Sequence, residues 1–172
     1  MTLSPRIKTI FKTKQIDLGN DGCHTVTGGI SQLEAEYLSE LVKKENLLNI
    51  LEIGVAHGIS TLSLCNSLQN VTNSNSESCG VVGIDPCQSS GHNNLCLRSL
   101  RVADLSSYFT LIEKPSHLAL PPLLEEKRLF DFVFIDGWHT FDYTLIDIFL
   151  SDKLLKPGGY LAMHDYFMPS KR

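Results

Sequence analysis

The sequence lacks the features that mark membrane proteins, secreted proteins and zinc knuckles. No apolar run approaches the roughly 20 residues that a transmembrane helix needs. The basic stretch 1–14 has no apolar core of the kind a signal peptide carries. We therefore expect a cytoplasmic protein that does not act at a membrane. The cysteines contain no CxxC pair, which argues against a disulfide framework or a zinc site. They are Cys23, Cys65, Cys79, Cys87 and Cys96.

A strong excess of charge is also absent. The chain has 15 Lys and Arg residues against 19 Asp and Glu residues, for a formal net charge of −4. This mild negative charge does not favour a nucleic-acid backbone or an anionic membrane as partner. At 172 residues, the chain is long enough for one domain with a hydrophobic core.

The first 30 residues have weak hydrophobic periodicity and four glycines, so we expect an irregular lead-in over 1–30. Ser31 and Glu34 then form the sequence pattern of a capping box, which predicts a helix over about 32–44. From this point, over 31–172, the pattern is that of a single folded domain.

Downstream, strand-like apolar runs alternate with helical patterns. Short runs rich in Val, Ile, Leu and Phe predict buried strands at 49–54, 80–85, 109–112, 130–136 and 160–164. Helical spacing predicts helices at 59–68, 93–105, 121–128 and 140–155. Two prolines suit the first turn of the third of these helices, and Lys156–Gly159 would stop the last. The alternation predicts an α/β fold: a Rossmann-like, doubly wound sheet of about five parallel strands with helices on both faces.

The loop after the first strand carries a glycine pattern. In open α/β sheets, ligands bind beyond the carboxyl ends of the strands. Here that end reads Glu52–Ser60 (EIGVAHGIS), where Gly54 allows a tight turn and Gly58 allows close packing against the next helix. Ala56 stands where a dinucleotide fingerprint has its second glycine. The acid before the glycines could pair with a ligand ammonium but would repel a pyrophosphate. The pattern therefore favours an amino-acid-bearing cofactor over NAD.

The second strand ends in Asp85, and an acid at this place typically accepts hydrogen bonds from ribose hydroxyls. Asp85 lies further from the glycine loop than the usual gap of about 20 residues, and the Asn- and Ser-rich stretch 69–78 accounts for the excess. In the alternative interpretation the glycines only turn the chain and Asp85 caps a helix. Because both features follow neighbouring strands, we favour the ligand site.

Acids and histidines follow the fourth and fifth strands. Asp136 and His139 come after the fourth strand, and His164 and Asp165 end the fifth, so we expect the four side chains to converge. Two carboxylates with imidazole nearby suit a divalent cation such as Mg²⁺ or Mn²⁺. In the alternatives, Asp136 caps the next helix, His139 is a first-turn helix residue and His164 only orients Asp165. Trp138 either walls a pocket or covers the core.

Three segments together resemble the class I S-adenosylmethionine (SAM)-dependent methyltransferases. They are LEIGVAHGIS (51–60), VVGIDP (81–86) and FDFVFIDGWHTFDYTLIDIFLSDKLLKPGGYLAMHD (130–165). The last is the most specific and is similar to the branch of small-molecule and antibiotic-sugar O-methyltransferases, several of which use a divalent metal. The resemblance implies methyl transfer from SAM to a small hydroxylated molecule, assisted by Mg²⁺ or another divalent cation.

The resemblance also implies roles for residues. Those around the methionine part of SAM would be Glu52, Gly54, Gly58 and Ser60, with Ala56 in the same loop. Asp85 would bind the ribose, and Asp136 would border the cofactor. Asp136 and Asp165 would hold the metal, His139 would act as the general base, and His164 would be a further ligand or a substrate contact. Pro115 stands where this branch often has an Asp, which leaves Ser116 as the expected adenine contact.

The typical fold of that class adds a helix and two strands after the fifth strand, whereas only residues 166–172 remain here. We therefore expect a C-terminally truncated fold with an exposed edge strand, which dimerisation could cover. Two other functions stay open: a nicotinamide-dependent oxidoreductase and a non-catalytic SAM-fold module. The methyl acceptor also stays open among sugars, phenols, amino acids and peptides.

Overall fold

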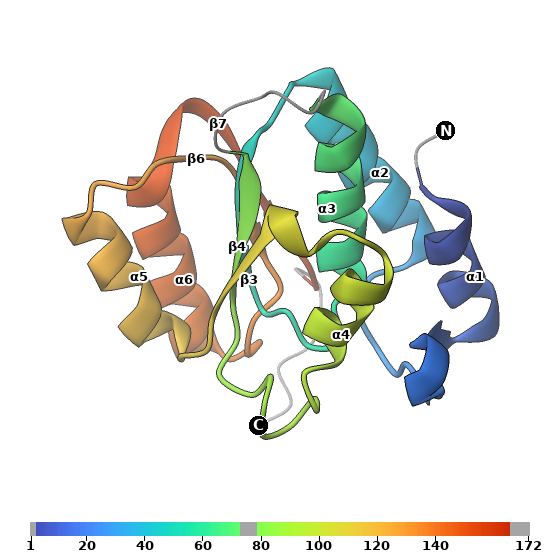
Figure 1. Ribbon diagram of the computed structural model, residues 1–172. Coiled ribbons are helices and arrows are strands. Elements are labelled where there is room, and N and C mark those ends of the chain that lie inside the picture. The colour runs from blue at the N-terminus through green and yellow to red at the C-terminus, as the bar shows by residue number, and fades with distance from the viewer. Residues whose placement is uncertain (1–2, 73–78, 166–172) are drawn as a thin grey trace.

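The computed structural model describes residues 3–72 and 79–165. Within these ranges, five parallel strands form one sheet in the order β5-β4-β3-β6-β7 (Figure 1). In that order the strands are Phe109–Ile112, Gly80–Ile84, Asn49–Ile53, Phe130–Ile135 and Leu155–Met163. The expected five-stranded parallel sheet is confirmed. The chain leaves β3 in one direction and returns to its other side at β6, so the ligand-binding crevice of such sheets falls between these strands.

Helices cover both faces of the sheet. The helices α1, α2, α3 and α4 lie on one face and α5 and α6 on the other (Figure 1). In chain order they are Pro5–Thr13, Gln32–Lys44, Ile59–Val71, Leu95–Val102, Ser116–Glu125 and Phe141–Leu154. None of the helices in the described part of the chain is long and apolar enough to span a bilayer.

The core consists of two layers because side chains alternate along each strand. Ile50, Phe132 and Phe134 belong to the cluster with α1 to α4. Leu51 and Val133, their chain neighbours, belong to the cluster with α5 and α6. Burial on both faces explains why these strands appear in the sequence as continuous apolar runs.

The helix α2 begins as its sequence predicts. The Ser31 hydroxyl accepts from the Glu34 N–H at 3.3 Å, and the Ser31 N–H donates to Glu34 Oε2 at 2.7 Å. This capping box satisfies two N–H groups that the helix itself leaves without partners. It also fixes the Glu34 side chain at the start of the helix, close to the carboxyl end of β7.

The expectation of an irregular lead-in over 1–30 is wrong for much of that segment. It contains α1 and a small antiparallel hairpin of β1 (Gln15–Asp17) and β2 (Cys23–Thr25). Ser4 caps α1, and Pro5 occupies its first turn. The segment folds because its few apolar side chains are buried in the core shared with the sheet. They include Ile7, Ile10, Phe11 and Ile16.

Helix boundaries differ most from expectation in two helices. The helix α5 begins at Ser116 rather than at residue 121, so both prolines lie inside it. It forms despite the two missing N–H groups because Ala119 and Leu123 pack against the sheet. The helix α4 is shorter than the expected 93–105 because Asn93 and Asn94 have left-handed φ values of +49° and +51°.

The strand β7 begins at Leu155, five residues earlier than expected. Leu155 pairs with Phe130, and the next pair joins Tyr160 to Phe132, so two steps on β6 face five on β7. The Lys156–Gly159 segment therefore forms a bulge inside the strand instead of a stop before it. The strand is an edge of the described sheet; pairing of this edge with a second copy stays a prediction.

Candidate active site

A cavity of about 420 Å³ lies at the carboxyl ends of the central strands. Its walls come from the loops after β3, β4 and β6 and from α5 and α6. Five of the residues expected to bind cofactor line it: Gly54, Ala56, Asp85, Ser116 and Asp136. The cavity has the size of a small-molecule site and the position that open α/β sheets give to ligands.

A smaller hollow of about 30 Å³ adjoins this cavity. It shares Gly54, Ala56 and Asp136 with the cavity and is also lined by Gly58 and Ser60. The 27–29 segment forms its opposite side, so the N-terminal region reaches the glycine loop. Because they share these residues, the two spaces lie side by side along the loop after β3, and we call them together the groove.

Two glycines of the loop are required by geometry. Gly54 has a φ of +91°, and a Cβ there would overlap the backbone carbonyl oxygen of Asp136. Gly58 has a φ of +82°, and a Cβ there would lie 2.6 Å from Cys96 Sγ. The first glycine lets the loops after β3 and β6 touch, and the second lets the start of α3 pack against α4.

Glu52 is fully buried and lines neither space. Its Oε2 accepts from the Thr61 hydroxyl at 2.6 Å, and its Oε1 has no hydrogen-bond partner among the described residues. Burial raises the pKa of Glu52 to about 7, aided by the negative charges of Asp136 and Asp85. Glu52 thus lies beneath the glycine loop, and its contact with a ligand stays a prediction.

Asp85 holds the glycine loop in place. Its Oδ2 accepts from the N–H groups of Val55 at 3.1 Å and Ala56 at 2.7 Å, and its Oδ1 accepts from the Cys87 N–H at 2.7 Å. A carboxylate has about four lone-pair sites, so these three bonds leave room for one more on Oδ1. The protein's own hydrogen bonds therefore leave one acceptor position on Oδ1, and binding of a ribose by Asp85 stays a prediction.

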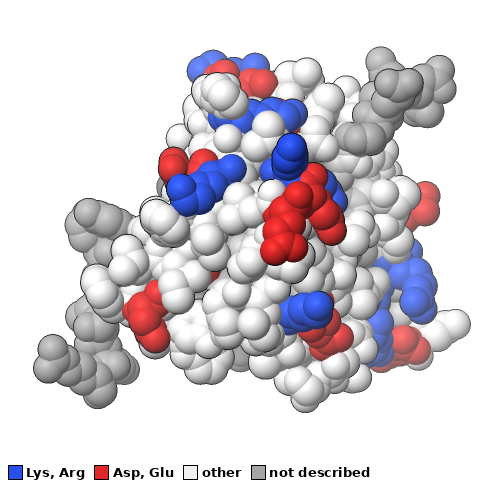
Figure 2. Space-filling view, turned by 90° about the vertical axis from the view of Figure 1, so that its left-hand side faces the viewer, with Lys and Arg blue, Asp and Glu red and all other residues white. Residues whose placement is uncertain are grey.

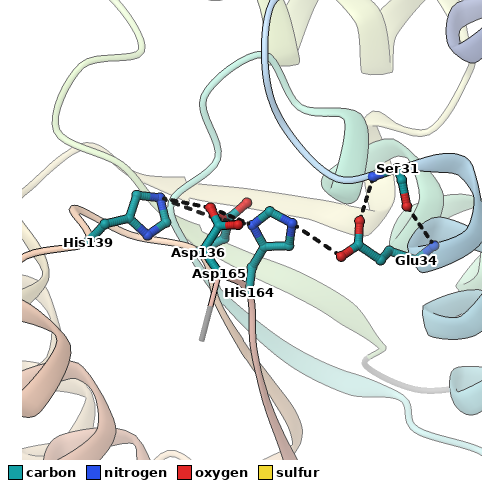
Figure 3. A network of polar contacts seen from close by, with 6 residues as sticks. All are labelled: Ser31, Glu34, Asp136, His139, His164 and Asp165. Atoms are coloured by element: carbon teal, nitrogen blue, oxygen red, sulfur yellow. Dashed lines mark hydrogen bonds and ion pairs between the residues drawn. The ribbon is translucent and has the colours of Figure 1, made fainter. Parts of the chain in front are cut away.

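The expected Asp and His residues do meet, next to the cavity wall at Asp136 (Figure 3). His164 Nδ1 lies 3.1 Å from Asp136 Oδ1 and 3.1 Å from Asp165 Oδ2. His139 Nε2 lies 3.6 Å and 3.8 Å from the same two oxygens. We call Asp136, His139, His164 and Asp165 the Asp–His cluster. Asp136 belongs both to this cluster and to the cavity wall.

Glu34 joins the cluster from α2. Its Oε1 lies 3.3 Å from His164 Nε2, while its Oε2 serves the capping box (Figure 3). Sequence reasoning assigned Glu34 only to the cap. Nothing in the local pattern indicates that the second oxygen faces a histidine 130 positions later, because that contact depends on the packing of α2 beside β7.

Charge is concentrated in the cluster. Burial lowers the pKa of His164, but the nearby carboxylates of Asp136, Asp165 and Glu34 outweigh it and raise that pKa overall. Burial also raises the pKa of Asp136, against the lowering effect of His164 and His139. His139 and Asp165 have left-handed φ values of +50° and +57°. Such backbone conformations are uncommon for residues other than glycine and tend to occur at functional sites.

The donor set fits a divalent cation. Ligand atoms of Asp136, His139 and Asp165 all lie within 4.8 Å of one another. His164 was the expected third ligand, and its Nδ1 lies closer to both carboxylates than His139 Nε2 does. Because Glu34 can accept a hydrogen bond from the Nε2–H of His164, Nδ1 would be left unprotonated with its lone pair free to bind a metal, a common arrangement for metal-bound histidines.

Trp138 and Asp147 also line the cavity. Trp138 is 68% exposed, which excludes the alternative that it covers the core. Asp147 is a buried acid on α6 that sequence reasoning missed. A lone acid among Ile146, Ile148 and Phe149 was the available signal, because burying a carboxylate without a role is costly.

A second hollow of about 440 Å³ lies on the other side of the cluster. Glu34 and His164 form its polar end. Its remaining lining is apolar or aromatic and comes from residue 30, α2, β6 and β7: Ile30, Leu33, Tyr37, Leu38, Phe134, Ala162 and Met163. The cluster therefore lies beside both the cavity of the glycine loop and this apolar hollow.

Comparison with protein families identifies the domain. A family described as a methyltransferase domain matches residues 51–166, which include the glycine loop, Asp85 and the whole cluster. The chain belongs to this family. The match supports methyl transfer over the nicotinamide-dependent alternative. A comparison with curated protein sequences found no match.

Solved structures share the fold. The O-methyltransferase from Bacillus cereus, in complex with SAH, has a TM-score of 0.72 and 21% identity, covering 94% of this chain and 66% of that one. TomG from Streptomyces achromogenes, an O-methyltransferase involved in tomaymycin synthesis and solved with SAM, has a TM-score of 0.70 and 20% identity, covering 94% and 65%. The SAH-bound methyltransferase from Podospora anserina has a TM-score of 0.63 and 19% identity, covering 78% and 53%. The chain thus spans about two thirds of the first two and about half of the third.

Proposed function

We propose that the protein transfers the methyl group of SAM to an oxygen of a small hydroxylated molecule, with a divalent cation in the Asp–His cluster. One observation carries the proposal: Asp136 belongs at once to the wall of the cavity and to the cluster. A methyl donor in the cavity and an acceptor hydroxyl at the cluster would therefore be neighbours. The family match supports the same chemistry.

The chain's own groups would hold SAM along the groove. The free lone pair of Asp85 Oδ1 would accept from a ribose hydroxyl. Gly58 and Ser60 line the small hollow at the start of α3, where helix N–H groups favour a carboxylate. Trp138 and Ser116, which also line the cavity, would border the adenine ring of SAM. Each contact is made by a different loop of the same sheet edge.

Asp136, Asp165 and His164 would hold the cation, and His139 would remove the proton. We assign His164 rather than His139 as the third ligand because Glu34 orients it. The cation would supply a lower pKa for a bound acceptor hydroxyl. The acceptor oxygen forms the bond to the methyl carbon, the carbon–sulfur bond breaks, and the hydroxyl proton goes to His139 Nε2. The His139 side chain is 41% exposed and can pass this proton to solvent.

The apolar hollow beside His164 supports an acceptor with an apolar or aromatic body. The apolar part of such an acceptor would pack against Leu38 and Phe134, while its hydroxyl group would reach the Asp–His cluster. Among its described residues, the face formed by α5 and α6 shows no patch of positive charge that could bind a nucleic acid. Charges of both signs are scattered among these residues (Figure 2). We accordingly propose a small molecule as acceptor and neither nucleic acid nor membrane as partner.

Calorimetry with SAH and NAD, each with and without Mn²⁺, tests the proposal. SAH should bind and NAD should not. A separate titration with Mn²⁺ should show binding that Asp136→Asn weakens at least about 10-fold, because one carboxylate ligand is lost. Asp142→Asn, an exposed acid nearby in the chain, is the control for charge and should bind Mn²⁺ like the wild type. Absence of SAH binding would refute the methyl donor, and an unchanged Mn²⁺ affinity in Asp136→Asn would refute the cation site.

A further inference from the structure

One acid in the cavity has no assigned role. Asp85, Asp136 and Asp147 all line the cavity, but Asp85 holds the glycine loop and Asp136 belongs to the Asp–His cluster. Asp147 is only 1% exposed, and its Oδ1 has no hydrogen-bond partner among the residues that the structure describes. A buried acceptor without a partner is costly, and a donor group of a ligand in the cavity would supply that partner.

The surroundings of Asp147 indicate where that donor lies. Ser116 from α5 shares a side-chain hydrogen bond with Asp147, and both residues line the cavity together with Tyr143 from α6; we call this part of the cavity its Asp147 end. The backbone of Gly137 passes close by, since a Cβ there would lie 3.1 Å from Asp147 Oδ2. Pro115 and Trp138 add flat apolar surface. An aromatic base could pack against such surfaces, with its polar edge toward the carboxyl group.

The other acid near this end is already engaged. Glu113 follows β5 but is exposed and does not line the cavity. Its Oε1 accepts from both the N–H and the hydroxyl of Ser89, at 2.6 Å and 2.5 Å. Pro115, at the position where an acid was expected, has no polar side chain. Asp147 is therefore the acid that the fold brings to this end of the cavity, from a different helix.

We propose that Asp147 accepts a hydrogen bond from the exocyclic amino group of adenine and so selects adenine over hypoxanthine nucleosides. This inference rests on the proposed function, because it assumes that SAM occupies the cavity. Hypoxanthine carries a carbonyl oxygen in place of the amino group, and two acceptors would then face each other. Leaving a buried polar group unpaired is a strong basis for rejecting a ligand.

The electrostatics of the site agree with this role. Burial raises the pKa of Asp147, while a side-chain hydrogen bond with Ser116 and the charge of His117 lower it. A ligand amino group at Oδ1 would stabilise the ionised carboxylate further. Ser116 would then act as a positioning residue that fixes the direction of the carboxyl group, in addition to bordering the base.

Calorimetry of SAH and S-inosylhomocysteine with the wild type and Asp147→Asn tests the proposal. The two ligands differ only in the purine, where a carbonyl oxygen replaces the amino group and N1 carries a hydrogen. The wild type should bind SAH at least about 10-fold more tightly. In Asp147→Asn the side-chain amide can donate to the hypoxanthine oxygen, so this preference should fall by at least about 10-fold. Asp142→Asn, the same substitution at an exposed position of α6, should keep the wild-type preference.

The outcomes separate this inference from the proposed function. If the wild type does not bind SAH, the proposed function fails. If it binds SAH and S-inosylhomocysteine equally, or if Asp147→Asn weakens both ligands by the same factor, SAM binding stands and the role of Asp147 is refuted. Because the wild-type comparison needs no variant, the inference can be refuted even where Asp147→Asn does not fold.

Discussion

At the scale of single residues, buried acids carry most of the information about this protein. Asp85, Asp136 and Asp147 line one cavity, and Glu52 lies beneath its floor. Three of the four could be placed from the sequence. Glu52, Asp85 and Asp136 lie at or next to the ends of the apolar runs that predict strands. For Asp147 the sequence offered only an acid among apolar helix residues, because a helix position shows its environment only when the neighbouring helix and loop are known.

Glu52 should make stability depend on pH. Its pKa is about 7 in the folded protein against 4.5 ordinarily, so the protonated form favours folding. The stabilisation is present below pH 4.5 and is lost as pH rises to about 7. We expect Glu52→Gln to reduce the fall in unfolding free energy between pH 5 and 8 by about 2 to 3 kcal/mol.

Urea denaturation at the two pH values measures this effect. Glu125→Gln, at an exposed position, is the matched control and should follow the wild-type pH profile. If Glu52→Gln and the wild type lose stability in parallel between pH 5 and 8, the buried carboxyl group is not the origin of the pH dependence.

At the scale of elements, the contact between the loops after β3 and β6 decides the shape of the site. Gly54 combines a positive φ with a backbone approach to Asp136. Gly158, in the bulge of β7, has a similar φ of +83° but no atom within 4 Å of its Cβ position. Comparison of the two substitutions with alanine therefore separates backbone strain from steric overlap.

Gly158→Ala should cost about 1 to 2 kcal/mol of unfolding free energy from backbone strain alone. Gly54→Ala should cost more than about 3 kcal/mol, because the carbonyl of Asp136 must also move. Urea denaturation of both variants at one pH gives the comparison. Equal costs would show that the approach of the two loops is not tight in solution.

The elements whose boundaries were wrong share one cause. The prolines of α5 and the Lys156–Gly159 segment of β7 signal a helix start and a helix stop in the local sequence. In the structure, the packing of α5 on the sheet and the pairing of β7 with β6 overcome these local preferences. Likewise, the hairpin of β1 and β2 has little periodicity of its own and is fixed by the burial of Ile16.

At the scale of the whole molecule, ligand binding should couple to unfolding. A ligand at 100 times its dissociation constant stabilises the folded state by about 2.7 kcal/mol. For a chain of this length, that corresponds to a rise in Tm of about 5 to 10 °C. Saturating SAH should give this shift, and the same concentration of NAD should give none.

Asp85→Asn provides the matched variant for this measurement. The amide can still accept from part of the glycine loop, but it lacks the charge and one of the acceptor oxygens that serve both loop and ribose. We expect its shift with SAH to be less than half that of the wild type. Differential scanning calorimetry measures the rise in Tm with SAH for the wild type and for Asp85→Asn. A rise in Asp85→Asn as large as that of the wild type would exclude Asp85 from the ribose site.

The sequence by itself determined the alternation of strands and helices, the parallel sheet, the glycine loop and the approach of Asp136, His139, His164 and Asp165. These depend on local periodicity and on the rule that parallel strands present their carboxyl ends at one edge. Tertiary structure alone decided the contact of Glu34 with His164, the three bonds that occupy Asp85 and the burial of Asp147 in the cavity wall. Each of these joins residues far apart in the chain, and only the packing of helices on the sheet sets such distances.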